Sequence, residues 1–176
     1  MQTAANIIGS AIERQQVEAA VRESEAKFRA IFENAGVGSD LIDGQGMVIQ
    51  VNQVFQEMLG YSEDEVIGKP FTTYMHPDDI VQDLAIFDGI VQGETDDFNM
   101  EVRYQRKDGQ GIWGHLTVST VRNDDGMLNY TIGMIRDITE RKRVEAQIKQ
   151  RNQELEALRS VALAVGSTLK LDEVLS

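Results

Sequence analysis

The chain of 176 residues contains no cysteine. This absence excludes disulfides, thiolate nucleophiles, cysteine-ligated clusters and covalent attachment of a flavin to a cysteine. Histidine is scarce as well, because only His76 and His115 are present and no HExxH pattern occurs. Two isolated imidazoles do not make a ligand set, so we do not expect a protein-bound metal or a haem.

Basic residues and long apolar runs are also in short supply. The formal net charge is -12, and such a surface repels phosphate backbones, so we expect no nucleic-acid partner. No apolar run approaches the length of a membrane span. The first residues lack the basic-then-apolar order of a secretion signal. We therefore expect a soluble, cytoplasmic chain with no membrane segment.

Glycine and proline are nearly missing from the N-terminal stretch. Residues 2–33 contain no proline and one glycine, Gly9. Their apolar spacing predicts a helix with an interruption near Ser24, and Asn34 and Gly36 are expected to end it.

The C-terminal stretch is helical from Thr139 onward and repeats its apolar residues at alternating steps of four and three. The row consists of Val144, Ile148, Arg151, Leu155, Leu158, Ala162, Val165 and Leu169, and all of these except Arg151 are apolar. Such a seam is typical of a two-helix coiled coil. An amphipathic helix that packs on its own domain is the alternative, and we favour pairing between chains, that is, a homodimer.

The middle of the chain alternates between strand and helix patterns. Strands are predicted at 39–42, 47–51, 99–106, 112–122 and 130–136, with short helices between the second and third. Two strands, then helices, then a three-stranded meander indicate an α+β domain with an antiparallel sheet.

Two helix starts are marked by polar residues. Ser62 and Glu65 form a capping-box pattern. At the second start, Pro77 suits the first position of a helix that runs to about residue 91. Asp78 and Asp79 would then lie at the positive end of the helix dipole, and His76 would act as a cap.

One face of the predicted meander is apolar. Alternation places Met100, Val102, Tyr104, Leu116 and Val118 on the inward side of the sheet. They form either a plain core or the wall of a ligand pocket, and no polar group is predicted to converge on them. Trp113 and His115 alternate to the outer face. No nucleophile, base and orienting group come together, so no catalytic site is expected.

Residues 24–139 resemble a PAS domain on several short motifs. The matching stretches are residues 25–34, Asp43–Gly46 leading into Asn52, residues 59–62 and 66–68, His76–Asp79, Arg106–Gly109 with Trp113, and Arg136–Lys142. The resemblance implies a five-stranded antiparallel sheet with short helices on one face and a small pocket. It also implies sensing, with flanking signalling helices that dimerise.

Departures from the family pattern bear on the cofactor. The light-sensing branch of the family carries a cysteine, and haem-binding relatives usually carry a histidine in the helix that spans residues 78–91 here. This chain has neither. A flavin held without a covalent bond, or another small molecule, is still open as a ligand.

The two ends resemble a second family. Residues 1–23 resemble the closing helix of a GAF domain, and residues 167–176 resemble the opening of another. With a PAS domain at 24–139 and a coiled-coil signalling helix at 140–166, the chain is expected to be a piece of a larger signal transducer.

The resemblance implies a sensory and dimerisation module that passes a ligand- or partner-induced change through a coiled coil to an output domain. Asp137, Ile138 and Thr139 would transmit this change, with Asp137 paired to a cation and Thr139 capping a helix that begins at Glu140. Two alternatives stay open. One is a ligand-free spacer, and the other is a fragment of a histidine kinase or cyclic-dinucleotide enzyme whose catalytic domain lies outside this chain.

Overall fold

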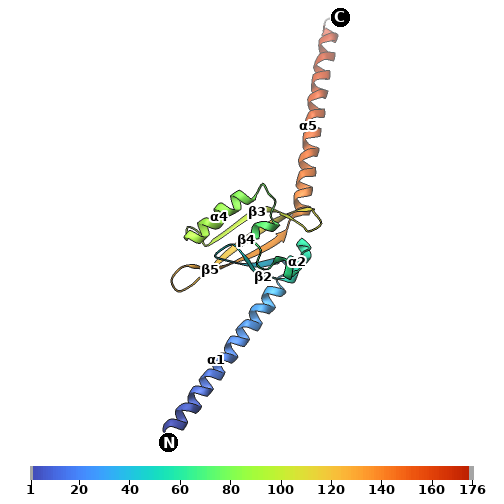
Figure 1. The fold of residues 1–176 in the computed structure, drawn as a ribbon. Coiled ribbons are helices and arrows are strands. Elements are labelled where there is room, and N and C mark those ends of the chain that lie inside the picture. The colour runs from blue at the N-terminus through green and yellow to red at the C-terminus, as the bar shows by residue number, and fades with distance from the viewer. Residues whose placement is uncertain (1, 175–176) are drawn as a thin grey trace. The chain divides into compact units, whose positions relative to one another are not determined.

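The computed structural model describes the backbone of residues 2–174 and the side chains of residues 13–163. The chain divides into two units at the bond between Asp137 and Ile138. The elements of the first unit (Figure 1) are α1 (Gln2–Glu33), β1 (Gly38–Asp43), β2 (Val48–Val51), α2 (Gln53–Leu59), α3 (Glu63–Val66), the 3-10 helix η1 (Phe71–Tyr74), α4 (Ile80–Gln92), β3 (Asp97–Gln105), β4 (Gly111–Arg122) and β5 (Leu128–Asp137). The second unit holds α5 (Thr139–Val174).

The first unit is built on one antiparallel sheet of five strands, in the order β2-β1-β5-β4-β3. The predicted α+β class is thereby confirmed. Two of the hairpins turn on glycines with positive φ, Gly109 at 84° and Gly126 at 79°, a backbone conformation that only glycine adopts without strain. The N-terminal strand β1 pairs with the C-terminal strand β5, so the two ends of the domain meet at the centre of the sheet.

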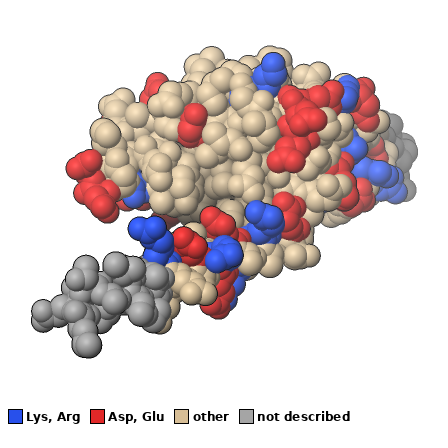
Figure 2. All heavy atoms as spheres, turned by 60° about the horizontal axis from the view of Figure 1, so that its bottom comes forward, with Lys and Arg blue, Asp and Glu red and all other residues tan. Residues whose placement is uncertain are grey.

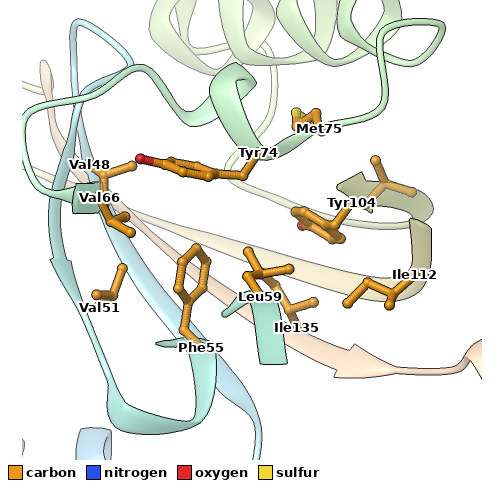
Figure 3. Close-up of a cluster of buried hydrophobic side chains, with 11 residues drawn as sticks. Val48, Val51, Phe55, Leu59, Val66, Tyr74, Met75, Tyr104, Ile112 and Ile135 are labelled. Carbon is orange, nitrogen blue, oxygen red and sulfur yellow. The ribbon is translucent and has the colours of Figure 1, made fainter. Parts of the chain in front are cut away.

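The hydrophobic core lies between the sheet and the short helices. Phe55 and Leu59 of α2 face the strands, and Tyr74 of η1 meets Phe55 edge-on with ring centroids 6.3 Å apart. Figure 3 shows these side chains converging with the strand residues Tyr104 and Ile135. Each buried residue of this size stabilises the fold by about 1.5–3 kcal/mol.

A buried amide joins three elements at the start of the domain. The Oδ1 atom of Asn52 accepts hydrogen bonds from the backbone N–H groups of Ser39 and Phe55, each at 2.9 Å. Its Nδ2 group donates to the carbonyl oxygens of Phe32 and Val37, also at 2.9 Å. Asn52 is therefore the cap of α2 and at the same time connects the end of α1 to β1.

Two predicted helix features are wrong. Helix α1 runs unbroken through Ser24, where an interruption was expected. Helix α4 begins at Ile80 rather than at Pro77, because the Asp79 carboxylate does not cap the helix and instead binds the side chain and backbone N–H of Arg103 on β3. His76 does not cap α4 either, since its Nδ1 accepts from the backbone N–H of Asp78 at 3.3 Å.

The surface of the domain carries its charge in separated groups. On the face drawn in Figure 2, acidic and basic side chains gather at the periphery of a broad uncharged area. Within the described part of the chain, no helix combines the length and the apolar character needed to cross a membrane.

Candidate functional site

A largely apolar cavity lies between the sheet and helices η1 and α4. It offers about 50 Å³ of space to the centres of water-sized atoms. One water needs roughly 10–15 Å³ on this measure, so the cavity has room for about three to five such groups. Six aromatic residues line it, namely Phe55, Phe71, Tyr74, Phe87, Phe98 and Tyr104.

Asp40 places a carboxyl group in this cavity from the centre of the sheet. The residue lies on β1 opposite Gly133 of β5, and it is only 7% exposed. Its Oδ1 atom has no hydrogen-bond partner. Burial raises the pKa of Asp40 to about 7, and the nearby backbone N–H of Gly133 opposes this rise. A carboxyl group in an apolar site behaves this way because the charged form loses its hydration.

The close approach of Asp40 to the sheet depends on glycine. A Cβ atom at Gly133 would lie 2.1 Å from Asp40 Oδ1, which is far inside van der Waals contact. Gly133 therefore makes the space that the carboxyl group occupies.

Asp83 supplies a second carboxyl group from helix α4. It is 5% exposed, and neither of its carboxyl oxygens has a hydrogen-bond partner. Burial raises the pKa of Asp83 to about 6, with a smaller contribution from the negative charge of Asp79. A buried carboxyl group that lacks partners is costly, so this position is unfavourable for folding alone.

The phenol of Tyr104 lies close to both acids. Burial raises the pKa of Tyr104 well above its ordinary value, and the negative charges of Asp40 and then Asp83 raise it further. The ring packs against Gly114, where a Cβ atom would approach its Cε2 atom to 2.6 Å. The buried hydroxyl residue Thr131 also lines the cavity. Three acidic groups thus converge in one apolar space.

The site offers acceptors but no positive charge of its own. No lysine, arginine or histidine is among the residues that line the cavity. In the part of the chain that the structure describes, no group of three or more potential ligands is placed to hold a metal ion. The arrangement can accept hydrogen bonds from a ligand, or hold protons on its carboxyl groups, while the aromatic rings exclude water.

The structure brings together four of the five predicted wall residues at this cavity. Met100, Tyr104, Leu116 and Val118 line it, whereas Val102 is fully buried in the adjoining core. The expectation that no polar group converges on this wall is wrong, because strand alternation identifies only one layer of a cavity. The acids come from β1 and α4, which pack against that layer.

Trp113 lies away from the cavity. It is half-buried on β4, on the opposite face from Leu116, and the Arg103 guanidinium carbon lies 5.7 Å from its ring centroid. Arg103 and Trp113 face each other across the β3–β4 pair, so the ring packs under a cation of its own chain.

Asp40 and Asp83 were missed by sequence reasoning, although both leave a signal. In α4, Asp83 interrupts the spacing of Ile80, Phe87 and Ile90, so it lies on the apolar stripe that faces the sheet. Asp40 stands between Ser39 and an apolar pair in a strand whose first residues are all buried. An acid on an apolar stripe or in a buried strand marks a candidate site.

The residues predicted to transmit a signal lie at the end of the sheet. Asp137 is the last residue of β5, and Thr139 is the first residue of α5. The carbonyl of Ile138 accepts from the backbone N–H of Lys142 at 3.0 Å. The helix therefore begins at Thr139, and Ile138, rather than Thr139, occupies the cap position.

The predicted seam residues of α5 carry exposed side chains. The exposed fraction is 41% at Val144, 56% at Ile148, 53% at Leu155 and 66% at Leu158. Ala162 is exposed too, whereas the side chain of Val165 lies outside the described residues.

The PAS fold family matches residues 26–138 of the chain. A similar protein is the probable diguanylate cyclase DgcE of Escherichia coli, with 36% identity over 83% of this chain and 13% of the relative. The sensor histidine kinase TmoS of Ectopseudomonas mendocina is 28% identical over 80% of this chain and 14% of the relative. The chain thus spans only about one seventh of these two proteins.

Solved structures agree with the fold. The PAS domain of an HTR-like protein from Haloarcula marismortui superposes with a TM-score of 0.59 at 26% identity, covering 70% of this chain and 99% of that one. The PAS domain of a protein from Colwellia psychrerythraea gives a TM-score of 0.60 at 23% identity, covering 68% and 98%.

Proposed function

Because the chain belongs to the PAS fold family, with a sensory domain homologous to those of sensor kinases and a diguanylate cyclase, we propose that it senses a small ligand in the cavity and passes the change to an output domain through α5. The observation that carries this proposal is the pair of buried, incompletely hydrogen-bonded acids in an otherwise apolar cavity. Such groups are rare in native proteins unless they serve a purpose.

The route from cavity to helix would be β5. Thr131 and Gly133 line the cavity and belong to this strand, which ends at Asp137, and α5 begins at Thr139. A ligand that shifts the Asp40–Gly133 contact would therefore act on the strand from which α5 continues. Asp137, Ile138 and Thr139 are the residues proposed to transmit this shift.

Dimerisation through α5 would couple a change in one chain to the α5 helix of a second chain. The exposed seam from Val144 to Leu158 supports a parallel homodimer, since a heptad row of this kind is stabilised by burial against its copy. The PAS domain is not itself catalytic, and we propose that the parent protein is a histidine kinase or a cyclase whose catalytic domain lies elsewhere.

The volume of the cavity limits the size of the ligand that it can admit. Its small volume leaves no room for a flavin unless the helices move apart, so a molecule of a few atoms fits the proposal better. The alternative is a spacer that binds no ligand. In that case Asp40 and Asp83 would stay buried without partners, or protonated, and no function would offset the cost of burying them.

A chimera tests sensing directly. The chain would replace the segment of TmoS that it matches, and autophosphorylation would be measured for Leu116→Phe, which fills the cavity from β4. Thr117→Phe is the matched control, because this neighbouring residue is exposed on the other face of the same strand. We expect a several-fold change in kinase activity for the cavity variant and none for the control.

Folding must be checked in both variants by the fluorescence of Trp113. Val118→Leu adds less volume to the same cavity and serves as a second variant if Leu116→Phe does not fold. Equal activity of folded cavity-filled and control chimeras would reject sensing through the cavity and leave the spacer.

A further inference from the structure

The acids of the cavity have no cation among the residues that line it, unlike Asp79 and Glu65 of the same domain. Asp79 is paired with Arg103, and Glu65 is bound by Lys107 with Nζ to Oε1 and Oε2 distances of 2.6 and 2.7 Å. The pKa values of both of these acids are lowered by their partners. The cavity contains two carboxyl groups, and three of their four oxygen atoms have no hydrogen-bond partner. No cationic side chain lines the cavity.

We propose that the cavity is selective for a small organic cation with N–H donors, such as an amidinium or a guanidinium, held by Asp40 and Asp83. This inference rests on the proposed sensory function and assigns its ligand class. A planar cation of this kind donates two parallel hydrogen bonds to a carboxylate, which is a strong and directional pairing. It would satisfy the oxygen atoms that the protein leaves without partners.

The rest of the wall suits the same ligand. The rings of Phe71 and Phe87 lie 5.2 Å apart at their centroids and both border the cavity. Aromatic faces attract cations, and this attraction is greatest where water is excluded. A metal ion fits less well, because hard cations take six or more oxygen ligands and this wall is mostly apolar. An anion would meet only acids.

Size narrows the ligand further. Space for about three to five water-sized groups matches a molecule of about four non-hydrogen atoms. Acetamidinium, acetamide and acetate all have this size and nearly the same shape, and they carry positive, zero and negative charge. Comparing their affinities therefore separates the contribution of ligand charge to binding from that of ligand size and shape.

Binding of the three probes to the 176-residue chain would be measured by NMR titration of the backbone amides at pH 7.5. A ligand this small has little binding energy, so Kd is expected in the millimolar range. We expect acetamidinium to bind at least tenfold more tightly than acetamide or acetate, with the largest shifts at β1, β5 and α4.

Variants assign the binding to the acids. Asp40→Asn and Asp83→Asn should each weaken acetamidinium binding at least tenfold, because each removes one negative partner. Asp88→Asn is the control, since Asp88 is an exposed acid on the same helix as Asp83. It should leave Kd unchanged.

Two outcomes overturn the inference: equal binding of all three probes, or acetamidinium binding that survives both cavity substitutions. Neither outcome touches the proposed sensory function, which depends on the activity of the cavity-filled chimera. Conversely, selective amidinium binding together with an unresponsive chimera would sustain the ligand class and reject the sensor.

Discussion

Replacing Asp40 by asparagine should make the stability of the domain less dependent on pH. The carboxyl group titrates near pH 7 in the folded protein and near its ordinary value of 3.8 in the unfolded chain. The folded state therefore holds a proton that the unfolded state releases, and the free energy of unfolding falls as the pH rises through this window. Asparagine has nearly the same shape and no charge to desolvate.

The size of the effect follows from the pKa difference. Each unit of pKa difference corresponds to about 1.4 kcal/mol. Roughly two units of the difference between the folded and unfolded pKa of Asp40 fall between pH 5 and pH 8. Relative to the natural chain, the Asp40→Asn variant should therefore gain about 2–3 kcal/mol of stability over this range. Asp83 also titrates with a raised pKa, but it is present in both proteins and its contribution cancels in the comparison.

Urea unfolding followed by the fluorescence of Trp113, the single tryptophan, would measure this difference at several pH values. Asp88→Asn controls for the loss of one surface charge, and its difference from the natural chain should not vary with pH. A constant Asp40→Asn difference, or one that shrinks as the pH rises, would refute the reasoning that burial holds the proton on Asp40.

Three other perturbations have definite expected results. Leu155→Asp combined with Leu158→Asp should convert the proposed dimer to a monomer in light scattering, and an unchanged mass would remove the seam from the proposal. Asn52→Ala should lower the free energy of unfolding by about 3 kcal/mol or more, because it removes four hydrogen bonds to backbone groups, three of them buried; a loss below about 1 kcal/mol in urea unfolding would contradict this. Asp137→Ala in the kinase chimera should alter activity while the melting temperature stays unchanged, whereas Asp124→Ala in the exposed hairpin turn should alter neither.

Local patterns were enough to predict most of the fold. The alternation in β3 and β4, the glycine turns between the last strands and the capping box at Ser62 all depend on neighbours in sequence, and each appears in the structure as expected. The start of α4 was wrong for a physical reason. The Asp79 carboxylate binds Arg103, which lies far along the chain, and it therefore does not cap the helix.

The candidate site was predicted only in part, because it is assembled across the sheet. The wall residues of β3 and β4 follow from alternation, but Asp40 and Asp83 reach the cavity from elements at opposite sides of it. Pairing of β1 with β5 places Asp40 against Gly133, and a sequence does not state which strands pair. The signals that do exist are an acid on the apolar stripe of α4 and an acid in a buried strand.

The contact between Asp40 and Gly133 also limits the order in which the two positions can change during evolution. Any side chain at position 133 would bring a Cβ atom within 2.1 Å of the carboxyl oxygen, so a larger residue there forces the buried carboxyl group of Asp40 to move. A lineage can lose the acid and keep the glycine without a clash, whereas losing the glycine first displaces the acid from its place. Among related sequences, a residue other than glycine at the position of Gly133 should therefore occur only where the acid of β1 is already gone.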